Sequence, residues 1–225
     1  MFTGSQNRQV NICFHGIGQL HAEREPGESQ YWITSSQFQH LLDTMVDRPD
    51  VAISFDDGNR SDVDVALPHL LDRGLRATFF PIAGRLSDPR SLAPAALREL
   101  IDAGMAVGSH GMWHRPWRRL TAAEAQEEFV QAREEISEAA GHPVIRAAVP
   151  LGRYDRKALA HLRRYRYTEV NTSDRRLPRR GAWLQPRFSV GADETPQTLE
   201  ARVAGASAPV TRARNSVAGL LKRLR

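Results

Sequence analysis

The chain has one cysteine, Cys13, among its 225 residues. A single thiol cannot pair within the chain, so a disulfide framework is excluded, and its place in the apolar run VNICF is typical of a small core residue. Long hydrophobic runs are also lacking. No stretch approaches the roughly 20 apolar residues of a membrane span, and the opening MFTGSQNRQVN lacks the charged-then-apolar pattern of a secretory signal. From the chain as given, we expect a cytoplasmic protein.

Acidic side chains are absent from residues 201–225, which carry six basic ones. Residues 1–200 carry 25 basic and 26 acidic side chains, so the net charge of +5 comes from this basic tail. Such a tail could touch an anionic surface, although a short amphipathic or frayed end is the simpler interpretation. The chain has no stripe of aromatic and basic residues of the kind that binds single-stranded nucleic acid, so we expect no nucleic-acid partner. We predict one domain over residues 1–200, followed by the tail.

Short β-rich apolar runs alternate with segments of helical period, which indicates an α/β fold. At this length the chain can bury one sizeable core, and its 41% hydrophobic and 25% charged residues are typical of a globular protein. Strands are predicted at residues 9–14, 51–55, 76–80, 105–108, 144–149, 167–171 and 187–190. Residues 16–33 and 172–186 are predicted to be irregular connections.

Helix ends are marked by residues that cap them. Thr34 with Gln37, and Thr121 with Glu124, have the spacing of a capping box at a helix N-terminus. Other ends are predicted from Pro94, Gly104, Gly74 and Asp155.

Polar side chains follow the C-terminal ends of several predicted strands: His15, Asp56, Asp57, Ser109, His110 and His114. In barrels of parallel strands, chemistry is located at these ends. Imidazoles and carboxylates brought together there suit zinc or another divalent ion. Such an ion would also compensate the repulsion between two adjacent carboxylates, one binding the ion and the other remaining available to accept a proton. Taken alone, Asp-Asp-Gly is more often a turn, and His-x-x-x-His is about as often a pair of surface or core histidines.

Three motifs resemble those of the polysaccharide deacetylase family, also called the NodB-homology or carbohydrate esterase 4 family. ISFDDG (53–58) is similar to its first motif, SHGMWH (109–114) to its second and AVPLGRYD (148–155) to its third. CFHGIG (13–18) and TSSQFQHLL (34–42) resemble the N-terminal stretch of one branch. The resemblance covers about residues 10–190 and implies a distorted (β/α)7-type barrel of mainly parallel strands.

The resemblance also implies roles. Asp56 would be the general base, and Asp57, His110 and His114 would hold the metal, with zinc as the first choice and cobalt, nickel or manganese as alternatives. The backbone N–H of Leu151 would help to bind the oxyanion. The implied reaction is removal of an N-acetyl group from an amino sugar in a polysaccharide or glycoconjugate, so the expected partner is an N-acetylated carbohydrate.

The chain departs from the common family pattern in three places. It has no histidine after His161, so the usual C-terminal L-x-H acid is missing, and His15 is the candidate acid, with positioning of the substrate as its alternative role. Gly111 replaces a Ser or Thr whose hydroxyl orders the second motif, so we expect a looser loop. Ala148 stands where the family has an Arg that orients the base, and Arg187 is the hypothetical replacement.

Side chains near the motifs are candidates for substrate binding, although core packing would explain each aromatic equally well. They are Tyr31, Trp113, Tyr154, Trp183 and Arg187. Two other functions stay open: an amidase or imidase of the same fold acting on a small cytoplasmic substrate, and a non-catalytic carbohydrate-binding domain that retains the metal.

Overall fold

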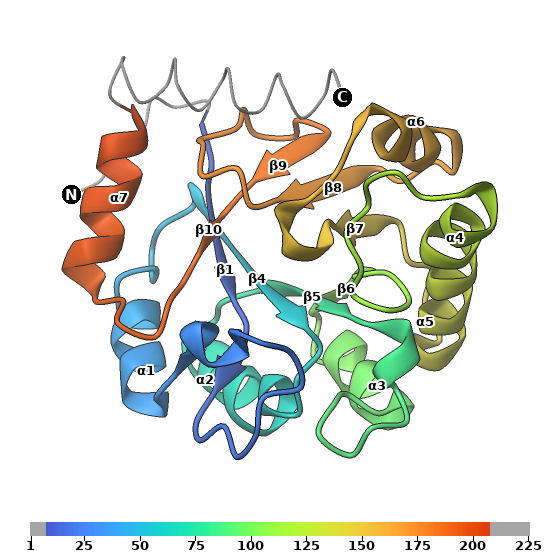
Figure 1. Cartoon of the computed structure of the whole chain (residues 1–225). Coiled ribbons are helices and arrows are strands. Elements are labelled where there is room, and N and C mark those ends of the chain that lie inside the picture. The colour runs from blue at the N-terminus through green and yellow to red at the C-terminus, as the bar shows by residue number, and fades with distance from the viewer. Residues whose placement is uncertain (1–7, 208–225) are drawn as a thin grey trace.

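Parallel strands form the centre of the molecule in a computed structural model that describes residues 8–207 (Figure 1). Five strands hydrogen-bond in the order β10-β1-β4-β5-β6, and three more in the order β7-β8-β9. The five are β1 (Val10–Phe14), β4 (Val51–Asp57), β5 (Ala77–Pro81), β6 (Ala106–Val107) and β10 (Phe188–Ser189). The three are β7 (Arg146–Ala148), β8 (Glu169–Thr172) and β9 (Leu184–Pro186).

The two sheets join at both edges and so form a barrel. A parallel bridge between Ser109 and Ala147 links the chain after β6 to β7. At the other edge only Arg187 separates β9 from β10, and its N–H donates to the Thr172 carbonyl at 2.7 Å, on the β8 side. If β9 and β10 count as one interrupted strand, the barrel has seven strand positions. The expected α/β fold, a distorted barrel of mainly parallel strands, is confirmed.

Three short strands lie where the sequence predicted irregular chain. β2 (Gly16–Ile17) pairs in parallel with β3 (Trp32–Ile33), and β9 falls within residues 172–186. Strands of two or three residues are too short to show the alternation that marks a strand in a sequence. At Gly16 a side chain is excluded, because a Cβ would lie 2.1 Å from the Trp32 ring.

Both predicted capping boxes are present. Thr34 and Gln37 exchange hydrogen bonds at the start of α1 (Ser35–Asp43), and Thr121 and Glu124 do so before α4 (Ala122–Gln126). α4 continues through a wider turn, η4 (Glu127–Gln131), into α5 (Ala132–Ala140). The remaining helical segments are η1 (Glu28–Tyr31), η2 (Asp62–Ala66), α2 (Leu67–Asp72), η3 (Ala83–Arg85), α3 (Pro94–Asp102), η5 (Pro150–Gly152), α6 (Arg156–Arg164) and α7 (Pro196–Ser207).

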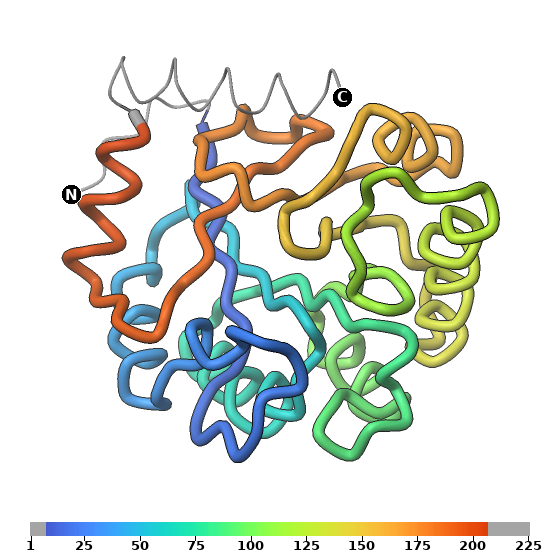
Figure 2. The backbone as a smooth tube through the Cα atoms, in the orientation of Figure 1, coloured from blue at the N-terminus to red at the C-terminus, as the bar shows by residue number. Residues whose placement is uncertain are grey.

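The last helix, α7, extends the folded domain into the predicted tail. Leu199, Val203 and Ala206 are buried in the main hydrophobic core, and Arg202 donates to the Ser189 carbonyl at the end of β10. Figure 2 shows α7 running along one side of the barrel. Residues 201–207 therefore belong to the domain, and the rest of the predicted tail lies outside the described residues. Within residues 8–207, none of the helices combines the length and the apolar character that crossing a bilayer requires.

A row of phenylalanines supports the functional end of the barrel. Phe14, Phe55 and Phe79 are in register on β1, β4 and β5, and their rings stack with centroids 5.4 and 4.7 Å apart. Successive side chains of a strand point to opposite faces, so Asp56 projects away from the face on which Phe55 packs. The buried Phe55 thus anchors the strand end that carries Asp56.

Candidate active site

Strained backbone marks the loops around the C-terminal ends of the strands. Four non-glycine residues there have positive φ: Asp57 (74°), His114 (55°), Leu151 (55°) and Arg175 (51°). This conformation is uncommon for residues with a Cβ, and it clusters at functional sites. Gly58 follows with φ 64°, and a Cβ there would lie 2.7 Å from the Pro81 Cα, so only glycine fits this turn.

Asp57, His110 and His114 point their polar atoms at one another. Asp57 Oδ1 lies 3.5 Å from His110 Nε2 and 3.4 Å from His114 Nε2. This oxygen is buried and has no hydrogen-bond partner within residues 8–207. A buried carboxylate oxygen without a donor is costly, which is expected where a cation belongs.

Hydrogen bonds orient both imidazoles so that their Nε2 atoms lie toward Asp57. His110 Nδ1 lies 2.9 Å from the Ala148 carbonyl oxygen, and His114 Nδ1 lies 2.6 Å from Glu25 Oε2. Both oxygens can only accept, so each Nδ1 carries the proton, and in the neutral ring the Nε2 lone pair faces Asp57. Two imidazole nitrogens and one carboxylate oxygen fit a divalent ion such as zinc and leave a further coordination position open.

The charges of the site support this interpretation. Burial lowers the pKa of His110 to about 4, so this ring is neutral at neutral pH. Burial would also lower the pKa of His114, but the Glu25 hydrogen bond and the Asp57 charge raise it overall. Burial would raise the pKa of Asp57, but the charges of the neighbouring histidines outweigh this effect and lower the pKa overall. His15 has the largest effect among them.

Asp56 has a different partner from its neighbour. Arg187 Nη1 and Nη2 donate to its two oxygens at 2.7 and 2.6 Å, and Nη1 also lies 3.0 Å from Ser54 Oγ. Burial would raise the pKa of Asp56, but the Arg187 charge lowers it well below its usual range. Asp56 is therefore an ionised, fixed carboxylate, and its Oδ2 lies 3.9 Å from His110 Nε2.

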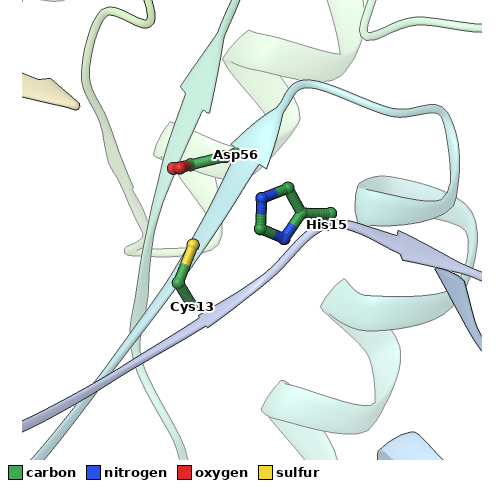
Figure 3. Close-up of side chains that lie close together, drawn as sticks. All are labelled: Cys13, His15 and Asp56. Carbon is green, nitrogen blue, oxygen red and sulfur yellow. The ribbon is translucent and has the colours of Figure 1, made fainter. Parts of the chain in front are cut away.

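His15 lies beside Asp56, directly after β1. Figure 3 shows the His15 ring close to the Asp56 carboxylate, together with the sulfur of Cys13, which belongs to β1. A nitrogen of His15, the Cys13 sulfur and an oxygen of Asp56 all lie within 4.8 Å of one another. The His15 ring stacks on Tyr31 with centroids 4.8 Å apart, and its Nδ1 has no hydrogen-bond partner in the described part of the chain. Cys13 is fully buried, and burial raises its pKa, so it stays a thiol.

The loop of the second motif is firmly held, which corrects the expectation that Gly111 loosens it. The buried carboxylate of Glu128 accepts hydrogen bonds from the backbone N–H groups of Met112 and Trp113 at 2.9 and 3.2 Å, and from Trp117 Nε1 at 3.1 Å. A Cβ at Gly111 would lie 2.2 Å from Glu128 Oε2. A carboxylate thus orders this loop, for which the resemblance implied a hydroxyl, and it requires glycine at position 111.

A pocket opens over these groups, with a volume of about 270 Å³. Its lining includes the three candidate metal ligands and also Asp56, His15, Tyr31 and Leu151. Leu151 lies at the rim and is 50% exposed. Further lining residues are not predicted from the sequence: Glu25, Glu28, Arg85, Arg153, Ser173, Arg175 and Ser189. Most belong to loops without a motif, and a charged loop residue gives no signal of the contact it makes.

The other candidates for substrate binding do not face this pocket. Tyr154 is buried and donates to Asp174 Oδ2 at 2.7 Å, and Trp183 lines a separate groove, where the Arg163 guanidinium lies 4.1 Å from its ring. Arg187 is 1% exposed and bonded to Asp56, so it orients the Asp56 carboxylate and cannot contact a substrate directly. Trp113 is 52% exposed but is not among the residues that line the pocket.

Comparisons with known proteins agree with this geometry. The family model described as polysaccharide deacetylase matches residues 43–170, more than half of the chain. The chain is 26% identical over 162 residues to YxkH of Bacillus subtilis (strain 168), whose name places it among polysaccharide deacetylases. The match covers 66% of this chain and 58% of that relative, so this chain spans less than two thirds of its length.

Solved structures of low sequence identity share the fold. The Streptococcus pyogenes deacetylase PplD, solved in complex with acetate, is 18% identical with a TM-score of 0.76, and the match covers 87% of this chain and 98% of PplD. IcaB from Ammonifex degensii is 22% identical with a TM-score of 0.70, and the match covers 90% of this chain and 98% of IcaB. With the family match over residues 43–170, the chain belongs to the polysaccharide deacetylase family.

Proposed function

We propose that this protein is a metal-dependent hydrolase that removes N-acetyl groups from an amino sugar in a polysaccharide or glycoconjugate. One observation carries the proposal: an unpartnered Asp57 oxygen faces two histidine Nε2 atoms, while the adjacent Asp56 is held separately by Arg187. Membership of the family and the fold shared with deacetylases support it.

Asp57, His110 and His114 would hold the metal ion. Zinc suits this donor set best, and cobalt, nickel or manganese are alternatives. When bound, such an ion supplies Lewis acidity, which polarises the acetamide carbonyl and makes a water more acidic.

Asp56 would accept the proton of the attacking water. Because Arg187 keeps this carboxylate ionised and fixes both of its oxygens, the acceptor is present and correctly oriented before substrate arrives. Arg187 also makes Asp56 a weak base, so the proton would stay only briefly on the carboxylate and would pass to His15 once His15 has protonated the leaving amine.

His15 would donate the proton that the leaving amine needs. It lines the pocket, lies close to Asp56 and is aligned by stacking on Tyr31. Its alternative role is to position the acetyl group. The Leu151 backbone N–H, carried at the pocket rim by a turn with φ 55°, would stabilise the oxyanion.

The test is acetate release from N-acetylglucosamine oligomers by the purified full chain. The chain is compared after zinc loading and after removal of metal with a chelator. A Trp183→Phe variant is the matched control, because Trp183 lies in a different groove. We expect zinc-dependent acetate release by the wild type and by the control. Zinc binding without acetate release from any N-acetylated sugar would favour a non-catalytic domain.

A further inference from the structure

A loop between β2 and β3 crosses beside the pocket, and one of its side chains contacts a proposed metal ligand. Glu25, Pro26, Gly27, Glu28 and Tyr31 of this loop, residues 18–31, line the pocket. Glu25 is the one that reaches the metal site: its Oε2 lies 2.6 Å from His114 Nδ1.

We propose that Glu25 is a positioning residue for the metal centre, and that it ties loop 18–31 to metal binding. The inference rests on the proposed function, because it requires an ion at Asp57, His110 and His114. By accepting a hydrogen bond from the Nδ1–H of His114, Glu25 fixes the ring with Nε2 toward Asp57 Oδ1, which lies 3.4 Å away. Its negative charge also makes the imidazole a stronger donor to a cation.

Glu25 is itself oriented by a second donor. Arg85 donates to Oε1 while His114 occupies Oε2, so each oxygen of the carboxylate has a partner. Arg85 belongs to η3, and this segment is bonded to the second-motif loop: the N–H groups of Ala83 and Gly84 donate to the carbonyls of Gly111 and Met112, both at 3.0 Å. Three separate segments therefore fix the His114 ring.

The neighbouring residue Arg24 attaches the loop to two further segments. Its guanidinium donates to Asn59 in the turn after Asp57, to Ser91 Oγ at 2.8 Å and to Glu28 at 2.9 Å. Arg24 thus holds the turn that follows Asp57, and the adjacent Glu25 holds the ring of His114. If an ion fixes His114, it also favours the docked loop, and by linkage the docked loop must favour the ion to the same extent.

The experiment measures zinc affinity of the full chain by competition with a chelator, for wild type, Glu25→Gln and Glu25→Ala. The Gln amide oxygen can still accept the hydrogen bond from His114 Nδ1–H but carries no charge, whereas Ala removes both the hydrogen bond and the charge. We expect the zinc Kd to rise by about 10- to 100-fold in Glu25→Ala and by less in Glu25→Gln. Glu23→Gln is the matched control, because Glu23 accepts hydrogen bonds from Gly27 and Ser29 within the same loop and none from His114.

A second readout follows the loop itself. Hydrogen exchange of the amides in residues 18–31 should slow when zinc is added to the wild type and should respond little in Glu25→Ala. Circular dichroism establishes that each variant is folded. A Kd for Glu25→Ala equal to that of the wild type, or an equal loss in Glu23→Gln, would overturn the inference. Failure of the wild type to bind one zinc ion, or retained binding in Asp57→Ala, would instead overturn the proposed function.

Discussion

Arg187 holds both oxygens of Asp56, at 2.7 and 2.6 Å, from the single position that separates β9 from β10. The two adjacent carboxylates of the first motif are therefore compensated in different ways. Asp56 has a permanent cation from its own chain, whereas Asp57 faces two imidazoles with one oxygen unpartnered within residues 8–207. This difference is the reason we propose Asp56 as the proton acceptor and Asp57 as a metal ligand.

Removing Arg187 should destabilise the protein strongly. Arg187→Met leaves Asp56 buried without its partner, which costs about 3–5 kcal/mol in the free energy of unfolding. Urea unfolding of the metal-free chain measures this cost. In the double variant Arg187→Met, Asp56→Asn, no unpaired charge is left, so part of the loss should be recovered. Equal stability of wild type and Arg187→Met would show that the ion pair contributes nothing net.

The same ion pair should give a pH signature. The pKa of Asp56 is lower in the folded protein than the value of about 3.9 for an unfolded Asp. The stabilisation is therefore fully present above about pH 4 and is lost as the pH falls below that value. The difference in unfolding free energy between wild type and Asp56→Asn should be constant from about pH 5 to 7 and should shrink at lower pH. A difference that grows as the pH falls would contradict this assignment.

Glu128→Gln should weaken the second-motif loop. The amide retains one acceptor oxygen but places an NH₂ group against N–H donors, so buried donors lose their acceptor. We expect the free energy of unfolding to fall by about 1–3 kcal/mol. Thermal unfolding measures the effect. Glu127→Gln is the control, because within residues 8–207 the Glu127 side chain makes only a partly exposed ion pair with Arg115, at 3.5 Å. This substitution should change the free energy of unfolding by less than about 0.5 kcal/mol. A similar small change in both variants would show that Glu128 does not order the loop.

His15→Ala should keep zinc and lose turnover. His15 is not among the three proposed ligands, so the zinc Kd should stay close to that of the wild type. A missing general acid lowers kcat by about 10²- to 10⁴-fold. Steady-state acetate release, with zinc stoichiometry measured on the same preparation, separates the two effects. If turnover is unchanged, His15 has no part in the proton transfer.

Much of the fold was predictable because its signals are local. Capping boxes at Thr34 and Thr121 and seven apolar runs specify the order of helices and strands, and the strand ends brought Asp57, His110 and His114 together as expected. The short strands β2, β3 and β9 were missed because two or three residues carry no periodicity.

The supporting contacts of the site were harder to predict, since they join distant loops. Glu128 does give a signal: it lies three residues after Ala125 and four before Ala132, on the apolar stripe of its helix, where a carboxylate needs a partner. Glu25 gives none, because its contact with His114 spans 89 residues and depends on how a charged loop folds back. Trp183 shows the converse, since an aromatic near a motif in sequence lies in a different groove.

The most direct test compares Asp56→Asn with Asp57→Ala in paired measurements of bound zinc and of acetate released from N-acetylglucosamine oligomers. The proposed roles predict that Asp56→Asn binds one zinc ion and releases no acetate, whereas Asp57→Ala loses both. Acetate release at the wild-type rate by Asp56→Asn, or one tightly bound zinc ion in Asp57→Ala, would contradict the division of roles between the two carboxylates.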